Sequence, residues 1–267
     1  MASPGRGWGT PISSFGKGHR VAIAYQRGST QRYNSGCVFA DEDVIMGSHE
    51  FEDRGAMNLR DQMDRIYGDM QLESIPWHLT EPPQLLVGAV ATGKIKPCKA
   101  VDIGCGSGNY AVWLARQGFD VTGFDISRQA IKHANDLAAR EGVSCRFIIA
   151  DLLGDLREFH AAFDFAYDWE VLHHIFPADR PRYIQNVHAV LRPSALYVSL
   201  CFSENDAAFG GMGKFRDTPL GTTLYFSSEQ ELRDLFSPLF DVLELRTIEI
   251  PGKRGAHLAN AAWLKRK

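Results

Sequence analysis

The sequence predicts an α/β domain built on a doubly wound, mostly parallel sheet of seven strands, closed by an antiparallel strand pair at the C-terminus. Between residues 100 and 202, short apolar segments alternate with helical patterns, an order that indicates parallel strands joined by crossover helices. The last two strand candidates, 242–250 and 257–265, are joined only by PGKRGA. That connection is too short for a helical crossover, so these two strands are expected to be antiparallel.

Each remaining element has a local signal. Apolar residues at 59, 63, 66 and 70 have helical spacing and predict a helix over 58–70. A second helix is expected from 84 to about 93. Ser127 and Gly142 cap a helix between them, and Ser228 with Glu231 forms a capping box for a helix to residue 236. The other strands are expected at 100–103, 121–124, 146–150, 163–167 and 196–202, and the other helices at 108–117 and 179–191.

Residues 1–56 differ from the rest of the chain. They contain nine glycines and show no sustained helix or strand period. Such a segment buries too little apolar surface to offset its ordering entropy. We therefore predict a flexible or atypical N-terminal extension over 1–56 and the α/β domain over 57–267. A lid or a partner-binding arm is the alternative for the first segment.

Composition and charge argue against several classes of protein. The net charge of −3 and the pI of about 6.3 do not favour a nucleic-acid partner. Five dispersed cysteines without a C-x-x-C pair indicate reduced thiols, not disulfides or a zinc site. No apolar run reaches the roughly 18 residues of a membrane span, and the N-terminus lacks the apolar core of a secretory signal. We expect a cytoplasmic protein; nothing in the sequence indicates its oligomeric state.

The stretch VDIGCGSGNY, residues 101–110, places glycines at alternate positions directly after a strand. Such a turn binds its ligand at the carboxyl end of the sheet. A P-loop is excluded because no lysine follows the glycines. The dinucleotide pattern G-x-G-x-x-G/A fails when counted from Gly104 and passes from Gly106 to Ala111. A nicotinamide-dependent oxidoreductase therefore stays open on the glycines alone.

Acidic residues at three successive strand ends distinguish between the ligands. Asp102 lies before the first glycine, Asp125 ends the second strand and Asp151 follows the third. A carboxylate beside a pyrophosphate is unfavourable because like charges repel, whereas Asp125 is placed to accept from ribose hydroxyls. Together they predict a nucleoside that carries positive charge and no phosphate. Taken singly, each acid is also explained as a turn or helix-capping residue.

D-x-G-x-G-x-G at 102–108, the strand-end Asp125 and the step Ala150-Asp151-Leu152 resemble the class I S-adenosylmethionine-dependent methyltransferases. The resemblance covers about residues 70–267, and the closing antiparallel pair belongs to the same Rossmann-like fold. It implies S-adenosyl-L-methionine as the cofactor. The binding residues that it implies are Asp102, Gly104, Cys105, Gly106, Gly108, Asp125, Ile126, Asp151 and Leu152.

The segment IPWHLTEPPQLL, residues 75–86, is similar to the entry segment of the thiopurine, halide/thiol and tellurite-resistance methyltransferases. That similarity implies that Trp77 lies over the cofactor; an ordinary core aromatic is the alternative. The chain departs from the group at Leu79-Thr80-Glu81, where a glycine often follows. It departs from the fold at 192–195, which reads Arg-Pro-Ser-Ala in place of Pro-Gly-Gly.

The fourth strand leads into YDWEVLHHI, residues 167–175. In this fold that strand end faces the reactive methyl group, so Asp168 and Trp169 are expected to contact the cofactor. Asp168 and His173 are the candidate catalytic residues, with packing as the alternative for the histidine. A metal site at the adjacent His173 and His174 is not expected, because adjacent residues on a helix point about 100° apart.

The loop 203–226 is expected to be a lid, with a plain surface loop as the alternative. Its Lys214 and Arg216 suit an anionic substrate.

The expected function is methyl transfer from S-adenosylmethionine to a small molecule by in-line displacement. Alignment and exclusion of water supply much of the rate, and a base is needed only for an oxygen or nitrogen acceptor. The alternatives are a non-catalytic S-adenosylmethionine-binding regulator and the nicotinamide-dependent oxidoreductase.

Overall fold

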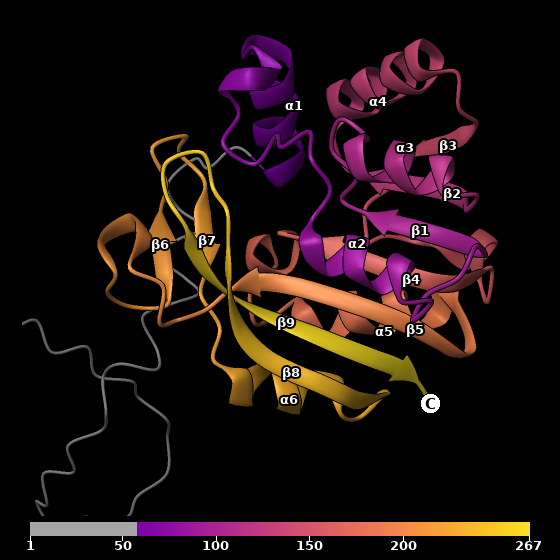
Figure 1. Ribbon diagram of the computed structural model, residues 1–267. Coiled ribbons are helices and arrows are strands. Elements are labelled where there is room, and N and C mark those ends of the chain that lie inside the picture. Colours follow the sequence, from indigo (N-terminus) through magenta and orange to yellow (C-terminus); the bar gives the residue numbers. More distant parts are fainter. Residues whose placement is uncertain (1–57) are drawn as a thin grey trace, which may run out of the picture. The chain divides into compact units, whose positions relative to one another are not determined.

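Seven strands form one sheet in the order β3-β2-β1-β4-β5-β9-β8 (Figure 1). The parallel part consists of β1 (Lys99–Ile103), β2 (Asp120–Asp125), β3 (Cys145–Ile149), β4 (Phe163–Trp169) and β5 (Leu191–Phe202). β9 (His257–Arg266) runs antiparallel between β5 and β8 (Phe240–Ile250). The predicted sheet and its antiparallel closing pair are therefore confirmed. The computed structural model describes residues 58–267, so the extension predicted over 1–56 lies outside the described residues.

Helices cover both faces of this sheet. One face packs against α2 (Gln84–Ala91) and α3 (Asn109–Arg116), with Leu86 and Leu114 in its core. The other packs against α5 (Arg180–Val190) and α6 (Glu229–Phe236), with Tyr183 and Phe236 in its core. α4 (Arg128–Glu141) lies against α3 and β3. Burying the apolar side chains of both faces, at about 25 cal/mol per Å², drives this layered arrangement.

The predicted capping residues bound the helices. The Ser127 hydroxyl accepts from the Ala130 amide at the start of α4, and Gly142 ends that helix at a φ of 64°. At α6, Ser228 and Glu231 form both bonds of the capping box. These bonds satisfy amide groups that have no partner inside the helix.

Two segments differ from the sequence-based expectation. β5 begins at Leu191, not 196, because Leu191 pairs with Phe163 across a register shift near Ser194, which has a φ of 64°. The region expected as the loop 203–226 contains the one-turn helix η5 (Ala208–Gly210) and a hairpin of β6 (Phe215–Asp217) and β7 (Thr223–Tyr225). Strands this short have no readable period.

The two basic residues of this region serve the fold, which corrects their assignment to an anionic substrate. Arg216 is buried, and its guanidinium donates to the carbonyls of Glu204, Asp206, Ala208 and Gly213 at 2.6–3.0 Å. Lys214 forms ion pairs with Glu204 and Glu231. A buried guanidinium is retained only where its donors are satisfied.

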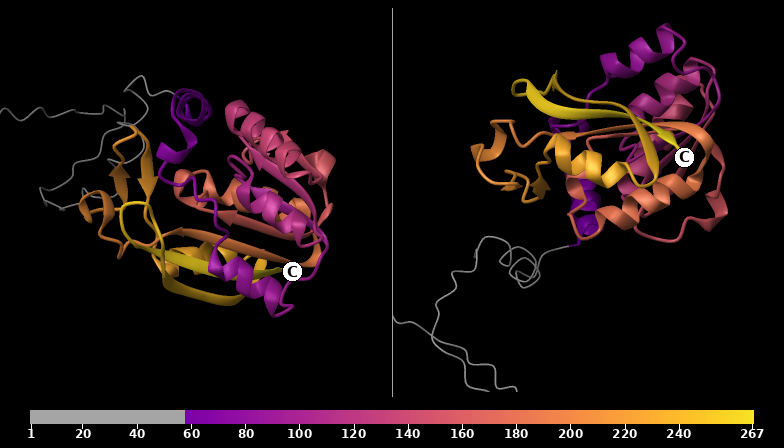
Figure 2. Two further views of the ribbon diagram at one scale, coloured as in Figure 1. Left: turned by 45° about the horizontal axis from the view of Figure 1, so that its top comes forward. Right: turned by 90° about the horizontal axis from the view of Figure 1, so that it is seen from below.

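α1 (Leu59–Asp69) lies against α4, as Figures 1 and 2 show. Its residues Met63 and Ile66 form a small core with Ile75, and Leu220 from the β6–β7 turn packs against that core. This core thereby brings together α1 and the β6–β7 turn, which lie far apart in the chain. No helix within residues 58–267 has the length and apolar character needed to cross a membrane.

Candidate active site

A cavity of about 950 Å³ opens at the carboxyl ends of β1, β2 and β4. The strand order reverses between β1 and β4, and α/β sheets bind ligands at this kind of switch point. α1, the segment 74–79, the glycine turn, the β6–β7 turn and the β8–β9 turn complete the lining. The lining divides into two halves, one of strand-end acids and backbone and one of aromatic side chains.

The glycine turn follows β1, and Gly104 and Gly106 have no room for a side chain. Gly104 has a φ of 70°, and a Cβ there would lie 2.2 Å from Cγ2 of Val171. The Gly106 amide donates to Asp125 at 2.8 Å, which ties the turn to the end of β2. Gly104, Cys105 and Gly106 all line the cavity. Their backbone is thus exposed to any ligand that enters.

Gly108 does not line the cavity with its neighbours, which corrects its assignment to the cofactor. A Cβ at Gly108 would lie 2.9 Å from Cβ of Ala134 and 3.0 Å from Cζ of Phe147. This glycine therefore permits α3 to pack closely on α4 and β3. Sequence spacing cannot separate a glycine that approaches a ligand from one that approaches another helix.

Asp125 has both carboxylate oxygens in use. One accepts from the Gly106 amide and the other from the Ser127 amide, each at 2.8 Å. Burial raises the pKa of Asp125 to about 6, and the two amide bonds work in the opposite direction. Asp125 lines the cavity beside Ile126. It organises the glycine turn and the start of α4 while keeping lone pairs for a ligand.

Asp102 is 3% exposed, lines the cavity and has an Oδ2 atom with no hydrogen-bond partner among residues 58–267. Burial raises the pKa of its carboxyl to about 7. Asp151 lines the cavity as well, with one oxygen accepting from the Leu153 amide at 2.8 Å, and Leu152 lies beside it. A buried carboxyl oxygen without a hydrogen-bond partner is costly unless a ligand complements it.

These residues pass a chemical test for the expected cofactor. The lining from the ends of β1, β2 and β3 contains three carboxyls and no lysine or arginine. A pyrophosphate would meet like charge there, whereas a cationic nucleoside would meet opposite charge. The orphaned Asp102 oxygen and the exposed glycine backbone therefore fit S-adenosylmethionine and do not fit a dinucleotide.

Trp77 borders the same space from the segment before α2. Its Nε1 donates to the Tyr67 hydroxyl at 2.9 Å, and both residues line the cavity. The segment is tied to the glycine turn by His78 Nδ1 and Ser107 Oγ, which lie 2.8 Å apart. Trp77 is therefore a cavity residue, as its motif predicted, and α1 supplies the tyrosine that orients it.

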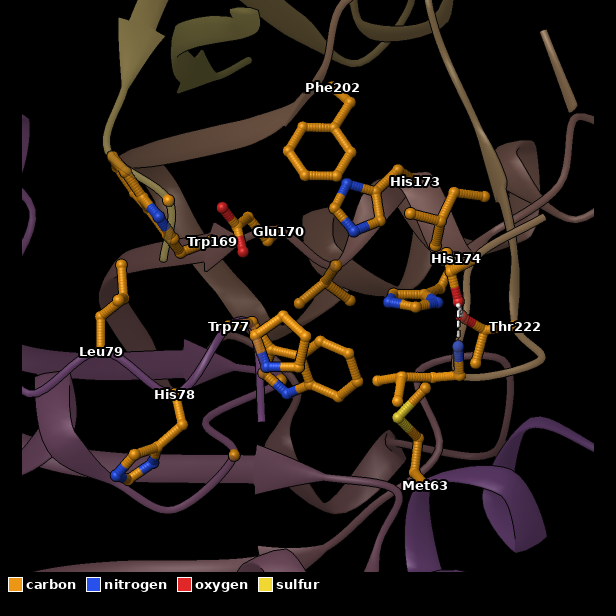
Figure 3. A pocket seen from close by; sticks show the side chains of 18 of the residues that line it. Met63, Trp77, His78, Leu79, Trp169, Glu170, His173, His174, Phe202 and Thr222 are labelled. Atoms are coloured by element: carbon orange, nitrogen blue, oxygen red, sulfur yellow. Dashed lines mark hydrogen bonds between the residues drawn. The ribbon is translucent and has the colours of Figure 1, made fainter. Parts of the chain in front are cut away.

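Asp168 lies elsewhere, which corrects its assignment as a catalytic and cofactor-contacting residue. Its carboxylate is fully buried, does not line the cavity, and accepts from the hydroxyls of Tyr183, Tyr197 and Ser199. Burial raises its pKa to about 6. Glu170 takes the cavity position instead, beside Trp169 (Figure 3). The segment therefore reaches the cavity through Trp169 and Glu170 and not through Asp168.

We call the half of the cavity with strand-end acids the cofactor half and the half with aromatic side chains the acceptor half. One side of the acceptor half is formed by five aromatic rings, together called the ring wall: His257, Phe202, His173, His174 and Trp77. Successive ring centroids lie 5.0, 4.4, 4.8 and 6.3 Å apart, and every member lines the cavity. Burial lowers the pKa of His173 well below its usual range and that of His174 to about 4. Both histidines are therefore neutral at neutral pH. Within the described chain no cluster of three His, Cys, Asp or Glu side chains is arranged to hold a metal ion.

Several cavity residues carried no usable sequence signal. Glu170 follows Trp169 at a left-handed φ of 65°, and this turn decides where its side chain lies. Tyr110 contacts the Trp169 ring edge-on at 6.5 Å. Tyr67 and the β8–β9 turn enter the lining only through tertiary packing.

Comparison with known proteins agrees with this geometry. Residues 100–194 match the family described as methyltransferase domain. A ribosomal RNA small subunit methyltransferase C from Alcanivorax borkumensis is 38% identical over 80 residues, which is 30% of this chain and 25% of that protein. A 2-heptyl-1-hydroxyquinolin-4(1H)-one methyltransferase from Mycobacteroides abscessus is 28% identical over 158 residues, which is 57% of this chain and 67% of that protein.

Two solved structures show the same fold. One, from work on the conversion of a disulfide bond into a thioacetal group during echinomycin biosynthesis, has a TM-score of 0.67 and 25% identity, covering 78% of this chain and 92% of its own. The other, the Burkholderia thailandensis 1,6-didemethyltoxoflavin-N1-methyltransferase with bound S-adenosylhomocysteine, has a TM-score of 0.53 and 20% identity, covering 84% and 86%. The chain spans between a quarter and two thirds of the length of the two curated relatives.

Proposed function

We propose that this chain, which carries a class I S-adenosylmethionine-dependent methyltransferase domain, transfers the methyl group of S-adenosyl-L-methionine to a small-molecule acceptor by in-line displacement. The observation that carries the proposal is the pairing of two unlike halves in one cavity. Asp102, Asp125 and Asp151 line one half without a basic partner, and the ring wall lines the other. A cationic nucleoside and an apolar acceptor would therefore meet between them.

The residues divide the binding work by their chemistry. Asp125 is placed to accept from the ribose hydroxyls, and Leu152 with Ile126 offers apolar surface to the base. The glycine backbone and Asp102 are placed to bind the positively charged end of the cofactor. When bound, the cofactor supplies a methyl group already activated by a positively charged sulfur. The chain's task is then to align the acceptor and exclude water.

A small molecule is preferred over a nucleic acid as the acceptor because the acceptor half is a concave site with aromatic side chains in its lining. Trp77, Trp169 and Phe202 face it, and clefts of this kind bind small ligands. The Mycobacteroides relative acts on a quinolone and the Burkholderia neighbour on didemethyltoxoflavin, both small molecules. We also propose kinship with the thiopurine, halide/thiol and tellurite-resistance group, on the strength of Trp77.

The first test is calorimetric titration of the full chain with S-adenosylmethionine at pH 6 and pH 8. The Asp102 carboxyl has a pKa of about 7, so it is mostly neutral at pH 6 and ionised at pH 8. A cation binds the ionised form better, and affinity should rise with pH in the wild type and rise less in Asp102→Asn.

The second test is a radiolabelled methyl-transfer screen over small thiols, halides, amines and hydroxylated compounds. Transfer to at least one acceptor supports the enzyme. Tight cofactor binding with no transfer to any acceptor would favour the regulator, and thermal stabilisation by a nicotinamide dinucleotide alone would favour the oxidoreductase.

A further inference from the structure

Glu170 is an acid in the acceptor half that the fold does not use. It follows β4 at a φ of 65° and lines the cavity between Trp169 and Val171. Its carboxyl forms no hydrogen bond or ion pair with any residue of 58–267. Figure 3 shows its side chain pointing into the cavity between Trp169 and His173. A carboxyl in this position is available to a ligand.

Asp168, Asp206 and His173 are already engaged or unsuited to take a proton, and Asp102 lies in the cofactor half of the cavity. Asp168 accepts from three hydroxyls, and Asp206 accepts from the amides of Ala208 and Leu258. Burial holds the pKa of His173 well below its usual range, so this histidine is a weak base. Burial raises the pKa of Glu170 to about 7, close to the value at which a general base works best at neutral pH.

The ring wall sets the shape of the molecule that Glu170 would meet. His173 and Phe202 stack face to face with an interplanar angle of 16°, so the faces that meet are covered and ring edges are left for a ligand. Glu170 and Trp169 lie beside these rings in Figure 3. A flat aromatic ring gains edge-to-face contacts with these rings, which an aliphatic acceptor cannot make.

We propose that the methyl acceptor is a flat heteroaromatic molecule with an acidic N–H or O–H group, and that Glu170 takes this proton during transfer. The inference rests on the proposed function and names its substrate class and base. The acceptor nitrogen or oxygen donates its lone pair to the methyl carbon, and its proton passes to a Glu170 oxygen. The carbon–sulfur bond breaks with its electron pair left on sulfur, which becomes a neutral thioether. Glu170 then releases the proton to solvent.

The kinetic test compares wild type, Glu170→Gln and the control Glu158→Gln, whose glutamate is exposed on the one-turn helix at Arg157–Phe159. The acceptors are 7-hydroxycoumarin and lumazine as flat acids, and mercaptoethanol and ethanolamine as aliphatic comparisons. We expect transfer to the flat acids and a 10²- to 10⁴-fold lower kcat in Glu170→Gln, the usual contribution of a general base. The wild-type rate should rise with pH through about 7, and the control should match wild type.

A binding test separates this inference from the proposed function. The neutral and ionised forms of 7-hydroxycoumarin absorb at different wavelengths, so an absorbance titration reports both its binding and its protonation without turnover. We expect wild type and Glu170→Gln to bind it within about tenfold of each other and Phe202→Ala to bind it more weakly. Circular dichroism confirms that each variant is folded.

The outcomes are distinguishable. Cofactor binding without binding of either flat acid, transfer only to the aliphatic acceptors, or a Glu170→Gln rate within threefold of wild type would each overturn the inference and leave the proposed function intact. No transfer to any acceptor despite cofactor binding, or binding of 7-hydroxycoumarin without any affinity for S-adenosylmethionine, would overturn the proposed function and the inference with it.

Discussion

Replacing Asp125 by alanine should weaken both the fold and cofactor binding, and the structure separates the two effects. The side chain accepts from the buried Gly106 and Ser127 amides at 2.8 Å each. Leaving a buried donor unpaired costs about 1–3 kcal/mol, so two cost about 2–6 kcal/mol. This is a large share of the 5–15 kcal/mol by which domains are typically stable.

The charge on Asp125 offsets part of that loss. Burial raises its pKa from 3.8 to about 6, which corresponds to about 3 kcal/mol of stability present below pH 4 and lost as pH rises through 6. The alanine variant does not lose stability in this way as pH rises, because it has no carboxyl at this position. The destabilisation it causes should therefore be greater at pH 5 than at pH 8.

Urea unfolding of wild type, Asp125→Ala and Asp125→Asn at both pH values measures this difference. The asparagine oxygen retains one of the two amide bonds, so Asp125→Asn should lie between the other two. Titration with S-adenosylmethionine should show a loss of about 10- to 100-fold in affinity, from charge-assisted bonds of about 1.5–3 kcal/mol. Equal stability of all three proteins at both pH values would refute the structural role, and unchanged affinity in a folded Asp125→Ala would refute the ribose assignment.

Three further predictions follow from the same contacts. Asp168→Asn should lower the unfolding free energy by about 1–3 kcal/mol, because the asparagine side chain offers one acceptor oxygen, whereas the carboxylate offers two oxygens to the three hydroxyls. It should leave cofactor affinity in calorimetry unchanged, and a large loss of affinity would return Asp168 to the site. Gly104→Ala should lower the free energy of unfolding measured in urea by about 1–3 kcal/mol, since its Cβ would lie 2.2 Å from Val171. The double variant Gly104→Ala, Val171→Ala should recover part of this loss, and a double variant no more stable than Gly104→Ala would contradict the explanation. Stability should fall by up to about 3 kcal/mol between pH 4.5 and 7 as the Glu170 carboxyl, raised to a pKa of about 7, ionises in the folded state, and Glu170→Gln should have a flatter stability profile.

The predicted strands, helix caps and glycine turn were recoverable from sequence because their causes are local. Ser127 and Glu231 cap helices through bonds within three residues, and Asp102 and Asp125 end strands whose apolar runs are short and clear. The carboxyl ends of parallel strands lie at the same end of the sheet, independently of the loop conformations. The strand-end acids of the cofactor half therefore followed from order along the chain.

The acceptor half did not follow from sequence, because it depends on contacts between distant segments. The ring wall joins Trp77 to His257 across most of the chain. Arg216 was read as a substrate contact and is a structural residue, because its four acceptors lie three to twelve residues away. Gly108 was read as a cofactor contact and instead makes room for Ala134.

The sequence by itself therefore determined the α/β architecture, the glycine turn and the acids at the strand ends. Only the tertiary structure decided which acid of the fourth strand end enters the cavity. Asp168 accepts from three hydroxyls inside the fold, whereas Glu170, two residues later, reaches the cavity because the backbone turns at a positive φ. Periodicity reports alternation along a strand, and it carries no information once the strand ends and packing against other segments directs the chain.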